Sequence, residues 1–396
     1  MIKVLRILNR FNIGGPTHNA TFLTKYLEPK FKTKLIAGKK LESEAGSEFI
    51  LKNYEIDFEI INNMSRSINP IKDIKSYLKI REIIKDFNPD IVHTHASKSG
   101  ALGRLAAISM NVPIIVHTFH GHVFHSYFGY FKTKFYIFLE RYLAWKSSAI
   151  IAISKLQKDE LINDFKICPA DKMHIVPLGF DLDKFQLNIS HNRNLFRDEF
   201  NLVDDEVAIG IIGRLTPIKN HSFFLRSIKD IQDQTSNKFK VFIIGDGEDG
   251  DYLKNLASKL NLKINSSDQD DPLIYFTSWR KDMDVIYAGL DIVALSSLNE
   301  GTPVTLIEAQ AANKPIVCTN VGGVHDVVIE GTTAMTCARE DRDGFSNNLR
   351  ILVDDDILRS KMGDAGYNHV SKLFGYRRLV KDVSNLYENL LNEKNI

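Results

Sequence analysis

The chain has 396 residues, 44% of them hydrophobic and 25% charged, which is typical of a globular protein and long enough for two domains. Its formal net charge is only +2, and no apolar run approaches the ~20 residues that cross a bilayer, which excludes a membrane-spanning helix. The cysteines show no C-x-x-C pair, which argues against a disulfide framework or a cysteine-built zinc site; they are Cys168, Cys318 and Cys337.

The first fifteen residues read MIKVLRILNRFNIGG, a short apolar stretch interrupted by Arg6 and Asn9. This pattern predicts a first strand and not a signal peptide, so we expect a cytoplasmic protein. Gly14 and Gly15 follow the strand directly, where the absence of side chains lets backbone N–H groups approach a phosphate. A tight turn without a ligand fits the same residues.

Short β-rich runs alternate with longer amphipathic runs along both halves of the chain. The strand-like runs are VLRIL, DIVHTH, PIIVHTF and AIIAIS, and then VAIGIIG, KVFIIG, LIYFT, DIVALS and PIVCTN. This alternation predicts an α/β fold of two doubly wound domains with mostly parallel sheets, joined near residues 180–200. We place the domains at residues 1–185 and 186–375, followed by a periodic helical segment that starts at Tyr376.

The two halves differ in charge. Residues 1–185 hold 27 Lys and Arg against 18 Asp and Glu, while residues 186–396 hold 24 against 31. Within residues 91–150 Glu140 is the only acid, so we expect this region to attract an anionic surface or substrate. The ordinary alternative is that these charges only keep the domain in solution.

Histidines concentrate at two neighbouring strand ends in the first half. Such density suggests a zinc hydrolase, because imidazole is the commonest metal ligand. No carboxylate lies between Asp90 and Glu140 to complete such a site, which favours a hydrogen-bonding or acid/base role for one or two of these histidines. They are His93, His95, His117, His120, His122 and His125.

Residues 124–146 read FHSYFGYFKTKFYIFLERYLAWK, with ten aromatic residues among four cations. Aromatic rings and cations both suit a lipid headgroup interface, so one interpretation is docking on an anionic membrane leaflet. The other interpretation is a helix whose aromatic residues fill the core of the domain. The basic character of residues 1–185 favours docking.

Two turns in the second half follow strands. Arg214 and Lys219 come just after VAIGIIG, where two cations would neutralise the charge on a departing diphosphate, although surface cations in a polar turn are common. The later stretch KVFIIGDGEDG matches the G-x-G-x-x-G dinucleotide pattern, but its crowded acids would repel a pyrophosphate. A turn around Gly245 that lines an uncharged nucleoside base stays open.

The stretch NEGTPVTLIEA at residues 299–309 predicts a helix with Thr302 as N-cap and Pro303 at the first helical position. A helix N-terminus presents unpaired N–H groups and a partial positive charge, which suits a diphosphate. Glu308 then lies roughly 7–8 Å along the helix axis, at the reach of a ribose. Glu300, on the preceding loop, would lie on the sugar side. Two solvated surface acids are the alternative.

Together these positions resemble the retaining glycosyltransferases of family 4, which have the GT-B architecture of two Rossmann-like domains facing a cleft. The family's E-x(7)-E element is matched by Glu300 and Glu308, and its R-x(4)-K pair by Arg214 and Lys219. Its Gly-rich loop is matched by Gly14-Gly15, its cleft histidine by His120 in HTFHG, and its inter-domain loop by PLGFDLDKF. In this family the last helix usually packs back on the N-terminal domain, as expected here for residues 376–396.

The resemblance implies a role for each position. Glu308 binds the ribose, Glu300 the transferred sugar, and His120 the sugar or phosphate near the anomeric carbon. Arg214, Lys219 and backbone N–H groups of the loop and helix start hold the diphosphate as leaving group, without a metal or other cofactor. The expected catalytic residues are His120, Arg214, Lys219 and Glu300; the expected substrate-binding residues are Gly14, Gly15, Gly245, Gly301, Thr302, Pro303, Val304, Thr305 and Glu308.

One departure from the family pattern affects the donor. Many members have an aromatic residue or a further glycine after E-G, where this chain has Thr302-Pro303-Val304, so the sugar contacts come chiefly from backbone. A UDP-hexose or UDP-N-acetylhexosamine is the expected donor, with GDP-mannose as an alternative.

The expected acceptor is a saccharide or lipid-linked saccharide in surface polysaccharide, O-antigen or capsule assembly, reached from the cytoplasmic face of the membrane. No nucleic-acid partner is expected. Two other hypotheses stay open from the sequence, a nucleotide-sugar epimerase or hydrolase of similar fold and the histidine-rich zinc hydrolase.

Overall fold

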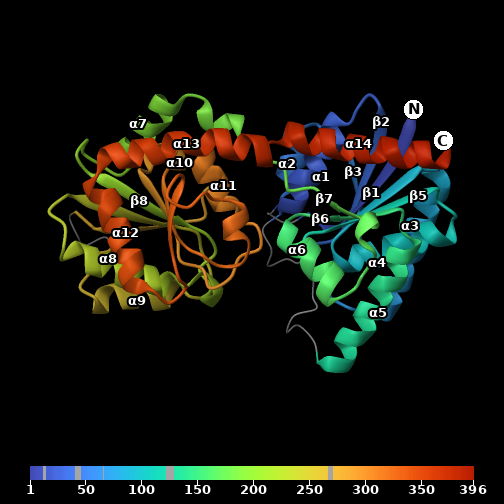
Figure 1. The fold of residues 1–396 in the computed structure, drawn as a ribbon, viewed down its shortest axis with the longest axis horizontal. Helices are drawn as coiled ribbons and strands as arrows, with labels where there is room; N and C mark the ends of the chain where they lie inside the picture. The colour runs from blue at the N-terminus through green and yellow to red at the C-terminus, as the bar shows by residue number, and fades with distance from the viewer. Residues whose placement is uncertain (12–14, 41–45, 66, 122–128, 266–270) are drawn as a thin grey trace. The chain divides into compact units, whose positions relative to one another are not determined.

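The computed structural model describes residues 1–11, 15–40, 46–65, 67–121, 129–265 and 271–396 (Figure 1). These residues form two units, one of residues 1–180 with 374–396 and one of residues 181–373. Gly14, His122, His125 and residues 124–128 of the aromatic stretch lie outside the described residues. Among the described residues no helix is long and apolar enough to span a bilayer.

The first unit contains a seven-stranded sheet in the order β3-β2-β1-β4-β5-β6-β7, with every neighbouring pair parallel. Its strands are β1 (Ile2–Arg10), β2 (Phe31–Gly38), β3 (Phe58–Ile61), β4 (Ile91–His95), β5 (Ile114–Phe119), β6 (Ala149–Ala152) and β7 (Met173–Ile175). Its helices are α1 (Gly15–Tyr26), α2 (Glu48–Asn53), α3 (Pro70–Phe87), α4 (Ser97–Ser109), α5 (Tyr130–Lys146), α6 (Lys155–Asp159) and α14 (Tyr376–Lys394), with short turns η1 (Glu160–Asp164) and η2 (Ala170–Lys172).

Helices cover both faces of this sheet, which explains why β4 and β5 are buried along their whole length. One face packs on α1 and α14, where Leu23 and Leu386 join Val4 of β1 in one apolar cluster. The other face packs on α3 and α4 through Ile80 and Ala106. The C-terminal helix α14 is therefore part of the first unit, and Figure 1 shows it beside β1 and α1.

The second unit contains a six-stranded parallel sheet in the order β10-β9-β8-β11-β12-β13. Its strands are β8 (Val207–Ile212), β9 (Phe239–Ile244), β10 (Ile274–Ser278), β11 (Ile292–Leu295), β12 (Ile316–Thr319) and β13 (Ala334–Cys337). Its helices are α7 (Ile189–Glu199), α8 (His221–Gln232), α9 (Gly250–Lys259), α10 (Met283–Gly289), α11 (Val304–Ala311), α12 (Arg342–Asp354) and α13 (Asp356–Phe374), with turns η3 (Asp183–Gln186), η4 (Pro217–Lys219) and η5 (Gly322–Asp326).

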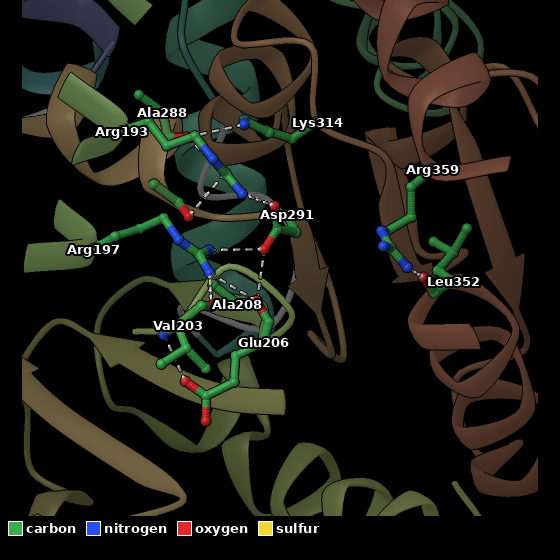
Figure 2. Close-up of polar contacts among 11 residues, drawn as sticks. Arg193, Arg197, Val203, Glu206, Ala208, Ala288, Asp291, Lys314, Leu352 and Arg359 are labelled. Atoms are coloured by element: carbon green, nitrogen blue, oxygen red, sulfur yellow. Dashed lines mark hydrogen bonds and ion pairs between the residues drawn. The ribbon is translucent and has the colours of Figure 1, made fainter. Parts of the chain in front are cut away.

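Ionic contacts at the amino end of this second sheet fix α7 against it (Figure 2). Asp291, just before β11, accepts hydrogen bonds from Arg193 at 2.8 Å and from the backbone of Ala208 at 2.8 Å, and lies 3.5 Å from Arg197. Lys314 donates to the carbonyl of Ala288 at 3.1 Å, and burial lowers its pKa to about 8. These contacts tie α7 to the sheet and to α10, so we interpret the cluster as structural.

Each sheet has a point where the chain reverses the direction in which strands are added. In the first sheet this point lies between β1 and β4, and in the second between β8 and β11. In open α/β sheets ligands bind beyond the carboxyl ends of the strands at such a point. The segments that follow β1 and β4, and those that follow β8 and β11, therefore hold the candidate sites.

Candidate active site

Two predicted site residues meet at the reversal point of the second sheet. Lys219, in the turn after β8, places its Nζ 2.6 Å from Oε1 of Glu300, in the loop after β11. The Ser297 hydroxyl donates to the same carboxylate oxygen at 2.6 Å. The Lys219 side chain keeps 25% of its surface exposed and that of Glu300 only 10%, so this is a partly desolvated ion pair open to solvent mainly on the lysine side.

Glycines let the loops around this pair approach one another. Gly245, after β9, has φ +141°, and a Cβ there would come 1.9 Å from the carbonyl oxygen of Gly213. A Cβ on Gly323 would come 1.8 Å from the carbonyl oxygen of Gly301, and the Gly323 N–H donates to the Glu300 carbonyl at 3.0 Å. The glycines of the G-x-G-x-x-G pattern thus include one needed for contact between two loops. That contact is independent of any dinucleotide.

The helix after Glu300 begins one residue later than the sequence predicts. Helix α11 starts at Val304, and Pro303 is its N-cap, without a side-chain hydrogen bond to the helix. Assigning Thr302 as N-cap and Pro303 as the first helical residue was wrong, because Pro303 has ψ 95°, an extended value, and leaves the helix to the next residue. Glu308 accordingly lies about 6 Å along the axis from the first helical residue.

The helix start is open on the side of the loop. A Cβ on Gly301 would meet nothing within 4 Å, while Thr302, Val304 and Thr305 are half-buried. The first N–H groups of a helix have no partner within it. This end of α11, beside the Lys219–Glu300 pair, therefore offers backbone donors and a cation to an anionic group.

Glu308 is half-buried inside α11 and is not the exposed helix residue of the alternative interpretation. The hydroxyl of Tyr287, a fully buried residue of α10, lies 3.2 Å from its Oε2 and 3.1 Å from the carbonyl oxygen of Thr305. Burial raises the pKa of Glu308, and the positive charge of Lys184 and the bond from Tyr287 oppose that rise. The carboxylate is thus held in place, and its second oxygen can accept a further hydrogen bond.

Arg214 differs from Lys219 in how it is held. Its side chain is 68% exposed, and its guanidinium lies 3.6 Å from Glu248, itself 56% exposed. Such exposed pairs contribute little and form and break easily. The structure therefore fixes Lys219 beside Glu300 and leaves Arg214 at the rim of the turn.

In the first unit, His120 follows β5 and is paired with His95 at the end of β4. Nε2 of His120 lies 2.9 Å from Nδ1 of His95, and the rings stack with centroids 5.2 Å apart. Burial lowers the pKa of His120 to about 4, so the imidazole is neutral at pH 7. Its Nδ1 is buried and has no hydrogen-bond partner among the described residues.

The helix that follows the Gly-rich loop borders the same place. Asn19 of α1 donates to the carbonyl of Gly15 at 2.9 Å and, with His95 and His120, lines one small cavity. Gly15 itself begins α1, and a Cβ there would press on Leu178 at 3.0 Å. Gly15 and His120 are thus at the two sides of one strand-end region, after β1 and β5.

The histidines of β4 and β5 and His120 pair with hydroxyls or with each other. Nδ1 of His93 lies 2.6 Å from the hydroxyl of Tyr387, and Nδ1 of His117 lies 2.8 Å from that of Thr94. Among the described residues no group of three His, Cys, Asp or Glu is placed to hold a metal ion. The described part of the chain therefore gives the zinc hydrolase hypothesis no ligand set.

Helix α5 exposes five of its aromatic residues. The exposed residues recur every three or four positions and form one stripe, which we call the aromatic stripe; they are Phe131 (85% exposed), Phe135 (61%), Phe138 (72%), Tyr142 (40%) and Trp145 (66%). Leu143 and Ala144 are fully buried on the opposite side. The interpretation in which the aromatic residues of 124–146 fill the core is therefore wrong for these five. Four exposed cations lie along the same helix: Lys132, Lys134, Arg141 and Lys146.

Three residues of this region were missed in the sequence. Ser297 could have been noticed, since it lies three residues before Glu300 in the same loop. Tyr287 and Tyr387 carry no comparable signal, because each reaches its partner across the fold, Tyr387 from 294 residues beyond His93.

Comparisons with known proteins show the family of this chain. Residues 38–184 match the model of the family described as Glycosyltransferase Family 4, and residues 192–369 match that of Glycosyl transferases group 1. The chain is 31% identical over 336 residues to the UDP-Gal:alpha-D-GlcNAc-diphosphoundecaprenol alpha-1,3-galactosyltransferase of Escherichia coli, covering 84% of each protein. It is 26% identical to the capsular polysaccharide biosynthesis glycosyltransferase CapM of Staphylococcus aureus, over 87% of this chain and 88% of that protein.

Solved structures share the fold over the whole chain. HepE of Anabaena, crystallised with UDP and glucose, superposes with a TM-score of 0.80 at 18% identity, covering 98% of this chain and all of that one. WaaG, a glycosyltransferase of lipopolysaccharide biosynthesis, gives a TM-score of 0.71 at 15% identity, covering 96% of this chain and 98% of that one. At these identities the likeness concerns the fold alone.

Proposed function

The chain belongs to glycosyltransferase family 4 and has the GT-B fold, and we propose that it transfers a hexose from a UDP-sugar to a lipid-diphosphate-linked saccharide with retention of configuration and without a metal ion. The observation that carries the donor side is the Lys219–Glu300 pair at 2.6 Å beside the open start of α11. A lysine and a helix N-terminus are the groups that replace a divalent cation at a diphosphate. The name of the E. coli relative supports UDP and a lipid-linked acceptor.

In this proposal the donor diphosphate lies against Gly301–Thr305 and takes Lys219 as its counter-ion. Because an ammonium carries three donors, Lys219 keeps its bond to Glu300 while it donates to a phosphate oxygen. The bond from the anomeric carbon to the phosphate oxygen breaks, the acceptor oxygen bonds to that carbon on the same face, and the acceptor proton passes to the departing phosphate. Arg214 is free to leave Glu248 and add a second positive charge.

The two glutamates then hold the two ends of the donor. Glu300 accepts from a hydroxyl of the transferred sugar, since Lys219 and Ser297 both donate to Oε1 and leave Oε2 for it. Glu308 accepts from the ribose hydroxyls, steadied by Tyr287. For His120 of the first unit, the proposal keeps the role that the family resemblance implies, contact with the sugar or the phosphate near the anomeric carbon.

The aromatic stripe of α5 and its cations support a second part of the proposal, that the first unit docks on an anionic membrane leaflet. Aromatic rings settle at the headgroup level, and each lysine or arginine near an anionic surface adds about 1 kcal/mol. A lipid-linked acceptor also requires the enzyme to work at a membrane.

The reaction is tested by incubating the protein with UDP-galactose, UDP-glucose or their N-acetylated forms and a short lipid-diphosphate-linked saccharide, with excess EDTA. Sugar transfer that persists in EDTA with an α-anomeric product is the expected result. Loss of all transfer in EDTA contradicts the metal-free mechanism, and a β product from an α donor contradicts retention. A change of the nucleotide sugar without acceptor would indicate the epimerase instead.

Docking is tested by cosedimentation with vesicles that contain phosphatidylglycerol, compared with phosphatidylcholine alone. The double variant Phe135→Ser and Phe138→Ser removes two of the exposed rings, and Lys229→Ser, which changes a residue of the second unit, is the control. We expect the wild type and the control to sediment at low salt and the double variant to remain in the supernatant. Equal sedimentation of all three proteins, or binding unaffected by added salt, contradicts docking through α5.

A further inference from the structure

A continuous set of buried polar side chains connects the C-terminal helix to His120. Arg6 of β1, fully buried, donates to the hydroxyl of Tyr387 on α14 at 3.2 Å and to Thr24 at 3.0 Å. The Tyr387 hydroxyl lies 2.6 Å from Nδ1 of His93. An arginine cannot accept a hydrogen bond, so among the described contacts of the Tyr387 hydroxyl His93 is the acceptor for its proton.

This contact fixes the tautomer of His93. Burial and the charge of Arg6 lower the pKa of His93 well below its usual value, so its ring is neutral. If Nδ1 accepts from Tyr387, the single ring proton is on Nε2, and Nε2 donates to the hydroxyl of Thr118 at 2.7 Å. Tyr387 therefore determines which way the His93 ring faces and where its proton sits.

His93 supports His95 directly. The two residues are on the same face of β4, two positions apart, and their rings stack with centroids 4.3 Å apart. The hydroxyl of Ser99 also donates to the His95 carbonyl. His95 is 1% exposed, and the only hydrogen bond that its ring makes within the described chain is the one to His120. The rings of His93, His95 and His120 thus form one stacked series.

The protons of the His95–His120 pair can be counted. Each neutral ring has one N–H and one lone pair, and one N–H is used in the 2.9 Å bond between them. Whichever ring donates, one free N–H and one free lone pair are left, on Nε2 of His95 and Nδ1 of His120. Both atoms are buried and lack a hydrogen-bond partner within the described chain. Both residues line a cavity of about 10 Å³, the size that one water needs.

A purely structural role does not explain this arrangement. A water in this cavity would have to serve both free ring nitrogens, and apolar residues of similar size would need no such partner. The pair instead has a property that apolar residues lack. If His95 donates, Nδ1 of His120 carries a proton, and if His95 accepts, Nδ1 of His120 is a lone pair. The state of His95 thus determines whether His120 offers a donor or an acceptor to a group that reaches Nδ1.

We propose that His95 is a positioning residue that holds the ring of His120 and couples the tautomer of that ring to its own, and that Tyr387 on the C-terminal helix holds His95 in place through His93. This inference rests on the proposed function, in which His120 contacts the sugar or phosphate near the anomeric carbon. It also gives the return of α14 to the first unit a role in the site. The helix supplies the hydroxyl that orders three histidines.

Two substitutions of His95 separate positioning from packing. In His95→Asn the side-chain amide replaces Nδ1 and can still bond to His120, whereas His95→Ala leaves no partner. The control is His191→Asn, at an exposed histidine of α7. The readouts are turnover of UDP-galactose with acceptor, the Kd of UDP by calorimetry, and the ¹⁵N signals of the His120 ring, identified by their loss in His120→Asn.

We expect His95→Ala to lower kcat ~10–100-fold, the usual effect of losing a residue that orients a functional side chain, while the Kd of UDP stays unchanged. The separate signals of protonated and unprotonated nitrogen in His120 should merge in this variant. His95→Asn should restore both the turnover and the separation. Tyr387→Phe should also lower the turnover and the separation of the two His120 signals. Its effect should be smaller than that of His95→Ala, because the ring of His93 is still packed.

The inference is overturned if His120 keeps its two distinct nitrogen signals in His95→Ala, or if His95→Asn behaves like His95→Ala. A lower melting temperature with unchanged His120 signals and unchanged kcat would indicate packing alone, which also overturns it. If the wild type turns over no UDP-sugar, the proposed function fails. The His120 signals in His95→Ala and His95→Asn still decide whether His95 positions that ring.

Discussion

The carboxyl ends of the two sheets carry opposite kinds of chemistry. The end of the second sheet holds ions, Lys219 against Glu300 and Arg214 near Glu248. The end of the first sheet holds neutral rings, because burial lowers the pKa of His95 and His120 below the physiological range. Two domains whose first six strands follow the same order thus differ in what they can bind. The charged end suits a diphosphate, and the neutral end suits hydroxyl groups.

The largest expected effect is at the charged end. Lys219→Ala removes the only fixed cation beside Glu300 in the described part of this site, so we expect kcat for sugar transfer to fall ~10²–10³-fold, as when one charge-stabilising group is lost. Steady-state kinetics with the UDP-sugar donor measures this. Lys238→Ala, at a lysine 66% exposed on the same unit, should leave kcat unchanged. If the two variants behave alike, the second sheet does not hold the leaving group through Lys219.

The next effect concerns the ribose contact. Glu308→Gln keeps the shape and removes the charge, so a hydrogen bond from a ribose hydroxyl loses its ionic acceptor. We expect the donor KM to rise ~10–100-fold with kcat little changed, which is the magnitude of one charge-assisted bond. An unchanged KM would contradict the assignment of Glu308 to the donor.

The neutrality of the histidines predicts a pH dependence of stability. The pKa values of His120 and His221 are lowered to about 4 by burial, against 6.5 in the unfolded chain. Between pH 6.5 and 4 the unfolded state binds more protons, so stability falls as the pH falls. Each of these histidines should lower the free energy of unfolding by about 2 kcal/mol at pH 5.

Urea unfolding at pH 7 and at pH 5 measures this loss. His221→Leu removes one of the buried histidines and should reduce the difference in unfolding free energy between the two pH values. A stability that does not change between pH 7 and 5 would mean that these histidines are not buried neutral, and the first sheet would lose the neutral end that His120 represents in the comparison.

The smallest effect is expected for Tyr287→Phe. The variant keeps the buried ring and removes the hydroxyl that contacts Glu308 and the Thr305 carbonyl. A net loss near ~1 kcal/mol in unfolding free energy and a modest rise in donor KM are expected, since one neutral hydrogen bond disappears. Thermal unfolding with and without UDP separates the loss of stability from the weaker binding of the donor. A rise in KM as large as that of Glu308→Gln would show that Tyr287 itself binds the donor.

Much of the fold follows from local patterns. Alternating strand and helix runs predicted two parallel α/β units, and both observed divisions lie within five residues of the predicted boundaries. Lys219 and Glu300 were predicted at one site because each follows a strand, and adjacent parallel strands end at the same edge. The start of α11 was missed by one residue, since Thr302 and Pro303 suit either the last loop position or the first turn.

The sequence by itself determined that glycine, lysine, glutamate and histidine residues follow the ends of strands. It could do so because hydrophobic periodicity and turn residues are local patterns that span only a few positions. Tertiary structure alone decided the partners: Tyr387 with His93 across 294 residues, Tyr287 with Glu308, and the outward direction of the aromatic stripe on α5. The reason is physical. A side chain's pKa, tautomer and exposure depend on what packs against it, and no local pattern records which distant helix that will be.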